Sequence, residues 1–286
     1  MVREFIEKAT LGRFVMHKGD SHFIGGGMHN PEAEPINTFV YNKGGDQQVT
    51  IDEITYTMPP ASILPLVSNQ HFTFERPEAL VAWQFNRAFY CIVDHDAEVG
   101  CVGFLFYGIQ HPMFIGLTPD DVSDMNDLEK VISDELTVHD NFQGEMLRTL
   151  LKRVIIKITR KAKKQCESYR LFPDEKMDLV RQFALLVETN FRQAHEVRFY
   201  ASALNKSPKT LSNVFALLKQ PNPSEIIRNR IMVEAKRYLH YSNKSAKEIA
   251  YELGFESPSH FNRFFKQHTG QPPIMFKDAV NQPTVD

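Results

Sequence analysis

The sequence predicts an α+β protein of two domains, in which short strands come first and helices make up the rest. Short apolar runs broken by turn residues fill the first hundred or so residues, which favours a small β-barrel or jelly roll. Helical apolar spacing takes over from Thr118, so the C-terminal domain is expected to be all α. With 286 residues, each domain has enough chain to bury its own core.

The N-terminal strands are expected where apolar and polar residues alternate over five or six positions. Clusters such as Asn42-Lys43-Gly44-Gly45-Asp46 and the pair Pro59-Pro60 separate them as turns. The expected strands are residues 36–41, 47–51, 54–58, 63–67, 80–85, 89–93 and 102–107.

Two helices are expected after the strands. Thr118-Pro119-Asp120-Asp121 predicts a helix start, because it offers a capping hydroxyl, a proline at the first position and acids in the first turn. A longer helix is expected over 141–166, with an apolar seam at heptad-like spacing: Leu147, Leu151, Val154 and Ile158. So broad a seam must be covered, either by a second copy of the chain in a dimer or by the chain's own barrel, and one stripe can serve both.

The same helix ends in a run of cations, which the negative end of the helix dipole favours. These are Lys157, Arg160, Lys161, Lys163 and Lys164, and we expect them on a solvated face. The predicted domain limits are a β domain over 1–117, a helical dimerisation segment over 118–168, a linker over 169–173 and a helical domain over 174–286.

The net charge of −2 conceals a strong polarity along the chain. Residues 1–151 contain 9 basic and 22 acidic side chains, whereas residues 152–286 contain 24 basic and 13 acidic ones. The C-terminal half therefore attracts polyanions and the N-terminal half repels them. This contrast is expected if the C-terminal half alone contacts nucleic acid.

A helix-turn-helix motif is predicted at 246–273. Apolar residues at Ile249, Ala250 and Leu253 share one helix face, and Gly254 then reverses the chain. Ser257 caps a second helix with an aromatic inner face, whereas its outer face is short, polar and cationic. Such a helix suits the major groove of DNA, although an ordinary amphipathic helix pair has the same pattern.

A second copy of this motif stands about fifty residues earlier, over 197–215. Asn205 and Lys206 form its turn, and Ser207-Pro208 opens its second helix. A long helix is expected over 224–241, between the two copies, where it would hold them a fixed distance apart. Two such units about 34 Å apart meet successive major grooves on one face of a duplex.

These residues resemble the DNA-binding domain of the AraC/XylS family of bacterial transcription regulators. The matching segments are SPKTLSNVF, NRIMVEAKRYL and SAKEIAYELGFESPSHFNRFFKQHTGQPP, followed by Met275-Phe276-Lys277. The resemblance covers 174–279 and implies that six side chains read bases: Lys209, Thr210, Asn213, Ser259, His260 and Arg263. Many family members carry Arg at the position of Asn213, which implies fewer base contacts in the first unit.

The N-terminal half is similar to the cupin-like sensor domains of this family in arrangement and position. The resemblance implies a small-molecule pocket inside the barrel, with ligand contacts drawn from His71, Trp83, Phe85, Phe104 and Phe106. The alternative for each aromatic residue is an ordinary place in the core.

A cupin-type metal-dependent enzyme or a sugar-binding protein with a helical appendage is the competing hypothesis. A catalytic cupin places two histidines one residue apart, and this sequence has no such His-x-His pair. Cys91, His95 and Cys101 are the nearest approach to a zinc site, with a buried strand cysteine and an exposed turn as the alternative. We therefore expect no metal, no cofactor and no catalytic residue.

The sequence as a whole favours a DNA-binding transcription regulator, and activation is the commoner outcome among relatives. Double-stranded promoter or operator DNA is the expected partner, beside a small-molecule effector and a second copy of the chain in a homodimer. No apolar run is long enough for a transmembrane helix, and the first residues lack the core of a signal peptide. Three cysteines suit a reducing compartment, so a cytoplasmic location without membrane contact is expected.

Overall fold

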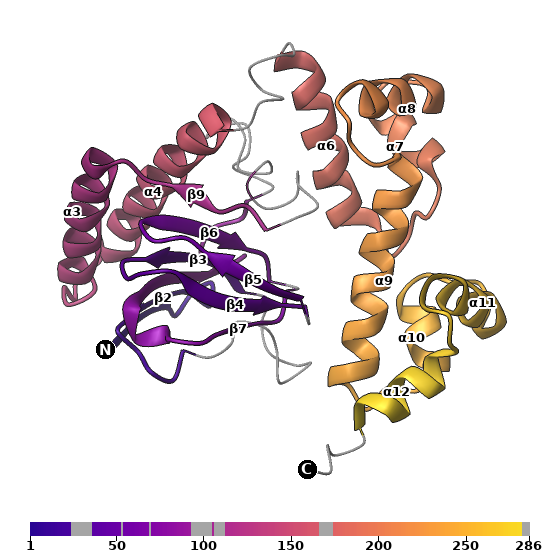
Figure 1. Cartoon of the computed structure of the whole chain (residues 1–286), viewed down its shortest axis with the longest axis horizontal. Helices are drawn as coiled ribbons and strands as arrows, with labels where there is room; N and C mark the ends of the chain where they lie inside the picture. The colour runs from indigo at the N-terminus through magenta and orange to yellow at the C-terminus, as the bar shows by residue number, and fades with distance from the viewer. Residues whose placement is uncertain are drawn as a thin grey trace. The chain divides into compact units, whose positions relative to one another are not determined.

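The computed structural model describes residues 1–23, 36–52, 54–68, 70–92, 105, 112–165 and 174–281. The chain forms two compact units, of which one ends at Asp174 and the other begins at Glu175 (Figure 1). Among the described residues, the first unit contains the sheets and two long α-helices, and the second has helices as its regular structure. None of the helices described is both long and apolar enough to cross a membrane.

Two antiparallel sheets form the first unit. The large sheet has the strand order β1-β2-β8-β3-β6-β9 and the small sheet has the order β5-β4-β7. The strands of the large sheet are β1 (Val2–Glu7), β2 (Gly12–Lys18), β3 (Ile36–Asn42), β6 (Ser62–Leu66), β8 (Leu80–Asn86) and β9 (Ile115–Gly116). Those of the small sheet are β4 (Gln47–Ile51), β5 (Ile54–Met58) and β7 (Phe72–Phe74), and a short 3₁₀ helix, Pro77–Ala79, precedes β8.

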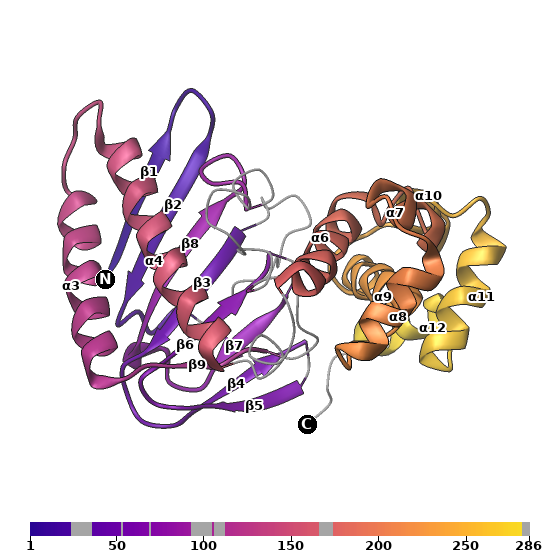
Figure 2. The same cartoon turned by 90° about the horizontal axis from the view of Figure 1, so that it is seen from above.

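The large sheet is buried on both faces. Along β8, Leu80 and Ala82 pack toward the small sheet, whereas Trp83 and Phe85 pack on the opposite face, because successive side chains alternate. Helices α3 (Pro119–Glu135) and α4 (Gln143–Gln165) cover that opposite face, so the unit has three layers (Figure 2).

The sheet-rich N-terminal domain predicted from the sequence is confirmed, but the two sheets do not close into a barrel. Among the described residues, β1 and β9 end the large sheet and β5 and β7 end the small one, without pairing across the gap. The expected strand over 89–93 is wrong for its described part, since Phe89 to Ile92 form a turn and irregular chain. The expected strand over 102–107 lies outside the described residues except for Leu105.

Helix α3 begins as predicted. The Thr118 hydroxyl accepts the backbone N–H of Asp121, and the Asp121 carboxylate accepts the backbone N–H of Thr118 at 2.8 Å. This reciprocal capping box satisfies two donors that the first helical turn leaves unpaired.

The seam of α4 is covered by its own domain. Leu147, Leu151, Val154 and Ile158 are each at most 1% exposed and belong to the core between the helices and the large sheet. These side chains cannot contact a second chain without opening that core. The assignment of these four residues to a dimer interface is therefore corrected in favour of the alternative, in which the stripe packs against the chain's own sheet.

The second unit is built around one long helix, α9 (Pro223–Tyr241). It contacts α7 and α8 on one side of the sequence and α10 and α12 on the other, so both halves of the unit share it. The remaining helices are α6 (Asp174–Asn190), α7 (Val197–Ala203), α8 (Pro208–Leu217), α10 (Ala246–Glu252), α11 (Pro258–Thr269) and α12 (Pro273–Asn281).

A buried ionic network ties α9 to α6. Arg230 bonds both carboxylate oxygens of Glu188, at 2.5 and 2.9 Å, and reaches Glu234 at 3.0 Å. Glu234 is fully buried and also accepts a bond from Arg192 at 2.8 Å. Burial alone would oppose ionisation of Glu234, but the surrounding guanidinium groups hold its pKa below the usual range. The network therefore keeps a charged carboxylate inside the domain.

Candidate nucleic-acid interface

The first helix-turn-helix unit consists of α7 and α8. Asn205 takes the left-handed conformation, with φ of 53°, in the turn between them. The Ser207 hydroxyl accepts the backbone N–H of Thr210 at 3.0 Å and caps α8, with Pro208 at the first helical position. Leu211 and Phe215 are fully buried, which fixes the inner face of the helix.

The three side chains that the sequence assigned to base reading in this unit are exposed on α8. Lys209 and Asn213 form no hydrogen bond or ion pair with other described residues. Thr210 shares a hydrogen bond of 2.8 Å with the Ser207 hydroxyl, so its side chain is partly committed to the cap. All three lie within the first two turns of α8, the part of a recognition helix that reaches base edges.

The second helix-turn-helix unit consists of α10 and α11. Gly254, with φ of 78°, ends α10, and the Ser257 hydroxyl accepts the backbone N–H of His260 at 3.3 Å to cap α11. Phe261 and Phe265 are fully buried, and Phe255 packs against Phe261 with ring centroids 5.3 Å apart. The aromatic inner face expected from the sequence is therefore present.

The outer face of α11 presents the other three assigned side chains. Ser259, His260 and Arg263 are all exposed. Arg263 forms no hydrogen bond or ion pair with other residues that the structure describes, so its guanidinium is available for an outside partner. His260 stands edge-on to the Phe255 ring at 5.4 Å, which limits the directions its imidazole can take.

The connection between α6 and α7, residues 191–196, binds the second helix-turn-helix unit to the rest of the helical domain. Arg192 bonds Glu234 of α9, and His195 Nε2 lies 2.8 Å from the Leu253 carbonyl oxygen at the end of α10. The His195 ring also packs on Phe255 at 4.8 Å. A segment that precedes the first helix-turn-helix unit thus touches the turn of the second one.

We expect the contact of His195 with Leu253 and Phe255 to make the stability of the second helix-turn-helix unit depend on pH. Burial lowers the pKa of His195 below its usual 6.5, and the charge of His260 acts in the same direction. The unfolded chain therefore binds this proton more readily, so the free energy of unfolding should fall as pH drops below 6.5. Urea unfolding at pH values above and below 6.5 measures this effect. The free energy of unfolding should depend less steeply on pH for His195→Asn than for the parent. His139→Asn, which changes an exposed histidine of the first unit, should keep the parent slope in the helical unit.

The three predicted ligand contacts that the structure describes, His71, Trp83 and Phe85, do not come together. Trp83 and Phe85 are buried in the core beneath α3 and α4, on the face of the sheet away from the space between the two sheets. His71 directly precedes β7 of the small sheet. Its backbone N–H donates to the Asp52 carboxylate at 3.0 Å, and its carbonyl oxygen accepts the backbone N–H of Asp52 at 2.9 Å. The placing of the two aromatic residues inside a barrel is wrong, because β8 turns its odd-numbered side chains toward the helices. Phe104 and Phe106 lie outside the described residues.

The candidate zinc ligands fall largely outside the description as well. Cys91 is buried and forms no disulfide with another described residue, whereas His95 and Cys101 lie outside the described residues. In the part of the chain that the structure describes, no three His, Cys, Asp or Glu side chains converge as a metal site.

One polar cluster between the sheets was missed by the sequence analysis. His17 of β2 bonds Asp20 at 2.8 Å and Gln84 at 3.0 Å, and Gln84 donates to Thr38 at 3.2 Å. Strand β2 was itself not predicted, so its alternating residues could not be assigned to a face. The polar residues between apolar ones in Gly12–Lys18 were the available signal.

Residues 200–279 match the family model of a helix-turn-helix domain. The C-terminal unit is an AraC-type helix-turn-helix domain, which confirms for this part of the chain the resemblance seen in the sequence.

Among curated proteins, the chain is 32% identical over 115 residues to the uncharacterized HTH-type transcriptional regulator YfiF of Bacillus subtilis. It is 29% identical over 106 residues to the bifunctional transcriptional activator/DNA repair enzyme AdaA of the same organism. These matches cover 38% and 37% of this chain, and only 36% and 49% of the relatives' own lengths. A solved structure of fatty-acid-bound ToxT from Vibrio cholerae aligns over 100% of this chain and 97% of its own, with 15% identity and a TM-score of 0.42.

Proposed function

We propose that the chain is a sequence-specific DNA-binding transcription regulator that acts without catalysis in the cytoplasm. The observation that carries this proposal is the pair of capped helices, α8 and α11, each with a buried inner face and an exposed polar outer face. Both belong to one AraC-type domain, and the curated relatives that match it are named as transcription regulators. The basic charge of residues 152–286 supports the same partner.

Affinity and specificity come from different groups in this proposal. Lysine and arginine side chains neutralise phosphates and release counterions, so the binding constant falls steeply as salt rises. Base reading falls to the six exposed side chains of α8 and α11, which donate and accept hydrogen bonds in the major groove. Activation is the proposed direction of control, as in the relative AdaA, which is named as a transcriptional activator.

The first unit is proposed to carry the signal, through a small-molecule effector, a change in self-association, or both. A homodimer remains part of the proposal, but the buried seam of α4 does not provide its interface.

The test is binding of the purified full chain to its own upstream DNA, measured by fluorescence anisotropy at several salt concentrations beside a scrambled duplex of equal length. Much tighter binding to the upstream DNA at high salt supports a sequence-specific regulator. No binding to either duplex at low salt contradicts the proposal and favours an enzyme or a small-molecule-binding protein instead. The metal content of the purified protein then becomes the next measurement, because bound iron or manganese favours the enzyme.

Arg263→Ala should weaken binding to the operator by about 1–3 kcal/mol, with the loss confined to one base pair. The reason is that an arginine on the outer face of α11 can donate two hydrogen bonds to a guanine edge. A panel of operators with single base-pair changes measures this, since the variant should no longer discriminate at one position.

Lys266→Ala is the matched control, because Lys266 is an exposed cation of the same helix and is not among the assigned base-reading residues. It should leave the ranking of operators unchanged. If Arg263→Ala also weakens all operators equally, Arg263 contacts phosphate and the assignment of a base contact is wrong. Lys209→Ala should act as Arg263→Ala does, at a base pair in the half-site of α8.

A further inference from the structure

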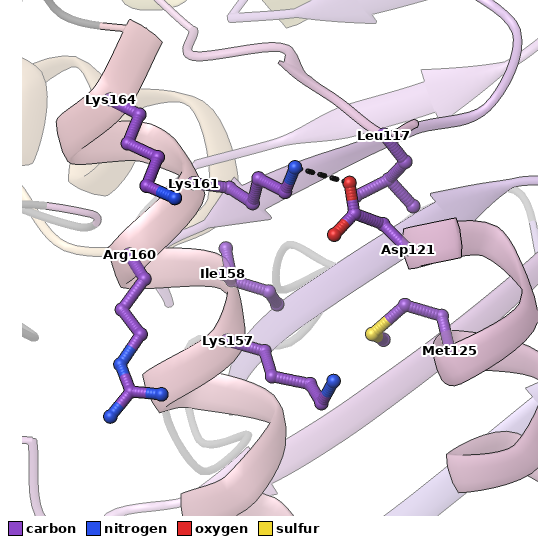
Figure 3. Close-up of a pocket in the computed structure, with 8 residues that line it drawn as sticks. All are labelled: Leu117, Asp121, Met125, Lys157, Ile158, Arg160, Lys161 and Lys164. Atoms are coloured by element: carbon purple, nitrogen blue, oxygen red, sulfur yellow. Dashed lines mark ion pairs between the residues drawn. The ribbon is translucent and has the colours of Figure 1, made fainter. Parts of the chain in front are cut away.

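A hollow of about 190 Å³ lies between the N-terminal half of α3 and the last turns of α4 (Figure 3). Its apolar floor is formed by Leu117, Met125 and Ile158, of which the last two are almost completely buried. Four cations of α4 and one acid of α3 complete the lining: Lys157, Arg160, Lys161, Lys164 and Asp121. The hollow belongs wholly to the first unit and is separate from the helix-turn-helix surfaces.

Two of the four cations are already neutralised. Lys161 forms an ion pair with Asp121, and Lys157 forms one with Asp124. Arg160 and Lys164 have no ion-pair partner among the described residues. Two positive charges on the α4 side of the hollow are therefore left without an ion-pair partner among the described residues.

Asp121 does not compete for these two charges. Partial burial raises its pKa, but hydrogen bonds from Lys161 and Thr118 outweigh this and hold the pKa at about 2. The carboxylate is thus ionised and occupied at neutral pH. An incoming anion meets Arg160 and Lys164 without first breaking an ion pair.

The helix dipoles account for part of this arrangement. Cations in the last turns of α4 offset its negative end, and no ligand is needed to explain their number. The dipole does not account for their position around a hollow, however, nor for the apolar floor. The positive end of α3 also lies at this hollow, through Leu117 and Asp121, and so favours a negative ligand.

We propose that the hollow binds a phosphate monoester with a small apolar body. The phosphate carries a charge close to −2 at neutral pH, which matches the two uncommitted cations, and arginine pairs with phosphate through two parallel hydrogen bonds. The apolar body covers Leu117, Met125 and Ile158. A carboxylate neutralises only one of the two cations, and inorganic phosphate leaves the floor uncovered.

The test uses ³¹P NMR of phenyl phosphate and inorganic phosphate in the same tube, titrated with the full chain in the absence of DNA. Each compound gives its own signal, so their line broadening can be compared under identical conditions. We expect phenyl phosphate to broaden strongly and inorganic phosphate to broaden little. Unlabelled phenol at equal concentration should not reverse the effect, because it lacks the charge.

Three variants and one control locate the site. Arg160→Ala and Lys164→Ala should each weaken phenyl phosphate binding roughly tenfold, the usual effect of losing a charged hydrogen bond. Arg153→Ala removes an exposed cation from the same helix outside the hollow and should bind as the parent does. Leu117→Ala should reduce the preference for phenyl phosphate over inorganic phosphate. All four changes fall on side chains that are exposed or half-buried, so far-UV circular dichroism should confirm an unchanged fold.

Several results overturn the proposal. The site is excluded if the ³¹P signal of phenyl phosphate does not broaden with the parent protein. It is also excluded if that signal broadens as much with Arg160→Ala and Lys164→Ala as with the parent. Equal broadening of inorganic phosphate shows that the apolar floor plays no part. If Arg160→Ala and Lys164→Ala weaken binding to duplex DNA while phenyl phosphate is unaffected, these cations serve the DNA backbone instead. Because the NMR titration contains no DNA, its outcome does not depend on the proposed function.

Discussion

Gly254→Ala should unfold the second helix-turn-helix unit. A Cβ atom at this position would lie 1.8 Å from the carbonyl oxygen of Arg192, which is backbone and cannot rotate away. The φ of 78° adds the strain that any non-glycine residue meets in the left-handed region, about 1–2 kcal/mol. The overlap with Arg192 forces the α6–α7 connection and the turn apart, so we expect a total loss above about 4 kcal/mol, in the range of exceptional substitutions.

Gly270→Ala is the matched control for this change. Gly270 has nearly the same φ, 80°, at the end of α11, but a Cβ there meets no atom within 4 Å. It should therefore cost only the conformational strain, about 1–2 kcal/mol. If the two substitutions lower the free energy of unfolding by similar amounts, the α6–α7 connection can move away at little cost. It then does not stabilise the second helix-turn-helix unit.

Both losses can be measured in the full chain. Far-UV circular dichroism during urea unfolding reports mainly the helical unit, with a smaller contribution from α3 and α4 of the first unit. The fluorescence of Trp83, the single tryptophan, reports the first unit alone. Gly254→Ala should move the helical transition and leave the Trp83 transition in place.

Arg230→Met should cost about 3–5 kcal/mol, the usual effect of removing one partner of a buried ion pair. Methionine fills part of the same volume, but Glu234, fully buried, loses one of its three cationic neighbours, and Glu188 loses both of its bonds to arginine. The loss should appear in the helical transition, because the network joins α6 to α9.

Arg228→Met provides the comparison. Arg228 lies on the same helix and is exposed. Among the described residues its side chain makes only one weak hydrogen bond, to Ser224 at 3.4 Å. Its replacement should change the free energy of unfolding by less than about 0.5 kcal/mol. If the two substitutions cost the same, the buried network contributes no net stability and the packing of α6 against α9 depends on its apolar residues alone.

The helical domain could be predicted in detail because its signals are local. Each Ser-Pro pair caps a helix within three residues, and Gly254 ends one within the same turn. Ser257 and Phe265 therefore report the start and the inner face of α11 without reference to any distant residue. The six assigned side chains are exposed for the same reason, since burying Phe261 and Phe265 leaves their positions outward.

The N-terminal domain was harder to predict because its decisive contacts are distant in sequence. The apolar seam of α4 indicates that something covers it, but a stripe of Leu and Val has the same composition whether the partner is a sheet or a second chain. Trp83 was correctly placed on a strand, yet the face that it occupies depends on which side of the large sheet the helices pack. Strand pairing such as β2 with β8, across some seventy residues, fixes that choice and leaves no local trace.

The α6–α7 connection belongs to the same class of feature. Nothing around His195 in the sequence indicates that its ring packs on Phe255, because the two are sixty residues apart. The hollow beside Lys164 was likewise visible only as a run of cations. Its apolar floor combines Leu117, just before α3, and Met125 of α3 with Ile158 of α4.

Helix α9 has a consequence for how binding sites of this protein should be sought. Its 19 residues make a rod about 28 Å long, and it packs against both helix-turn-helix units. If the chain binds DNA as proposed, the two contacted stretches of sequence form one element with an invariant gap. Inserting half a helical turn, about five base pairs, between them should abolish recognition, whereas changing the intervening bases should be tolerated. A genome search should therefore score the two stretches jointly, at one spacing and in one orientation.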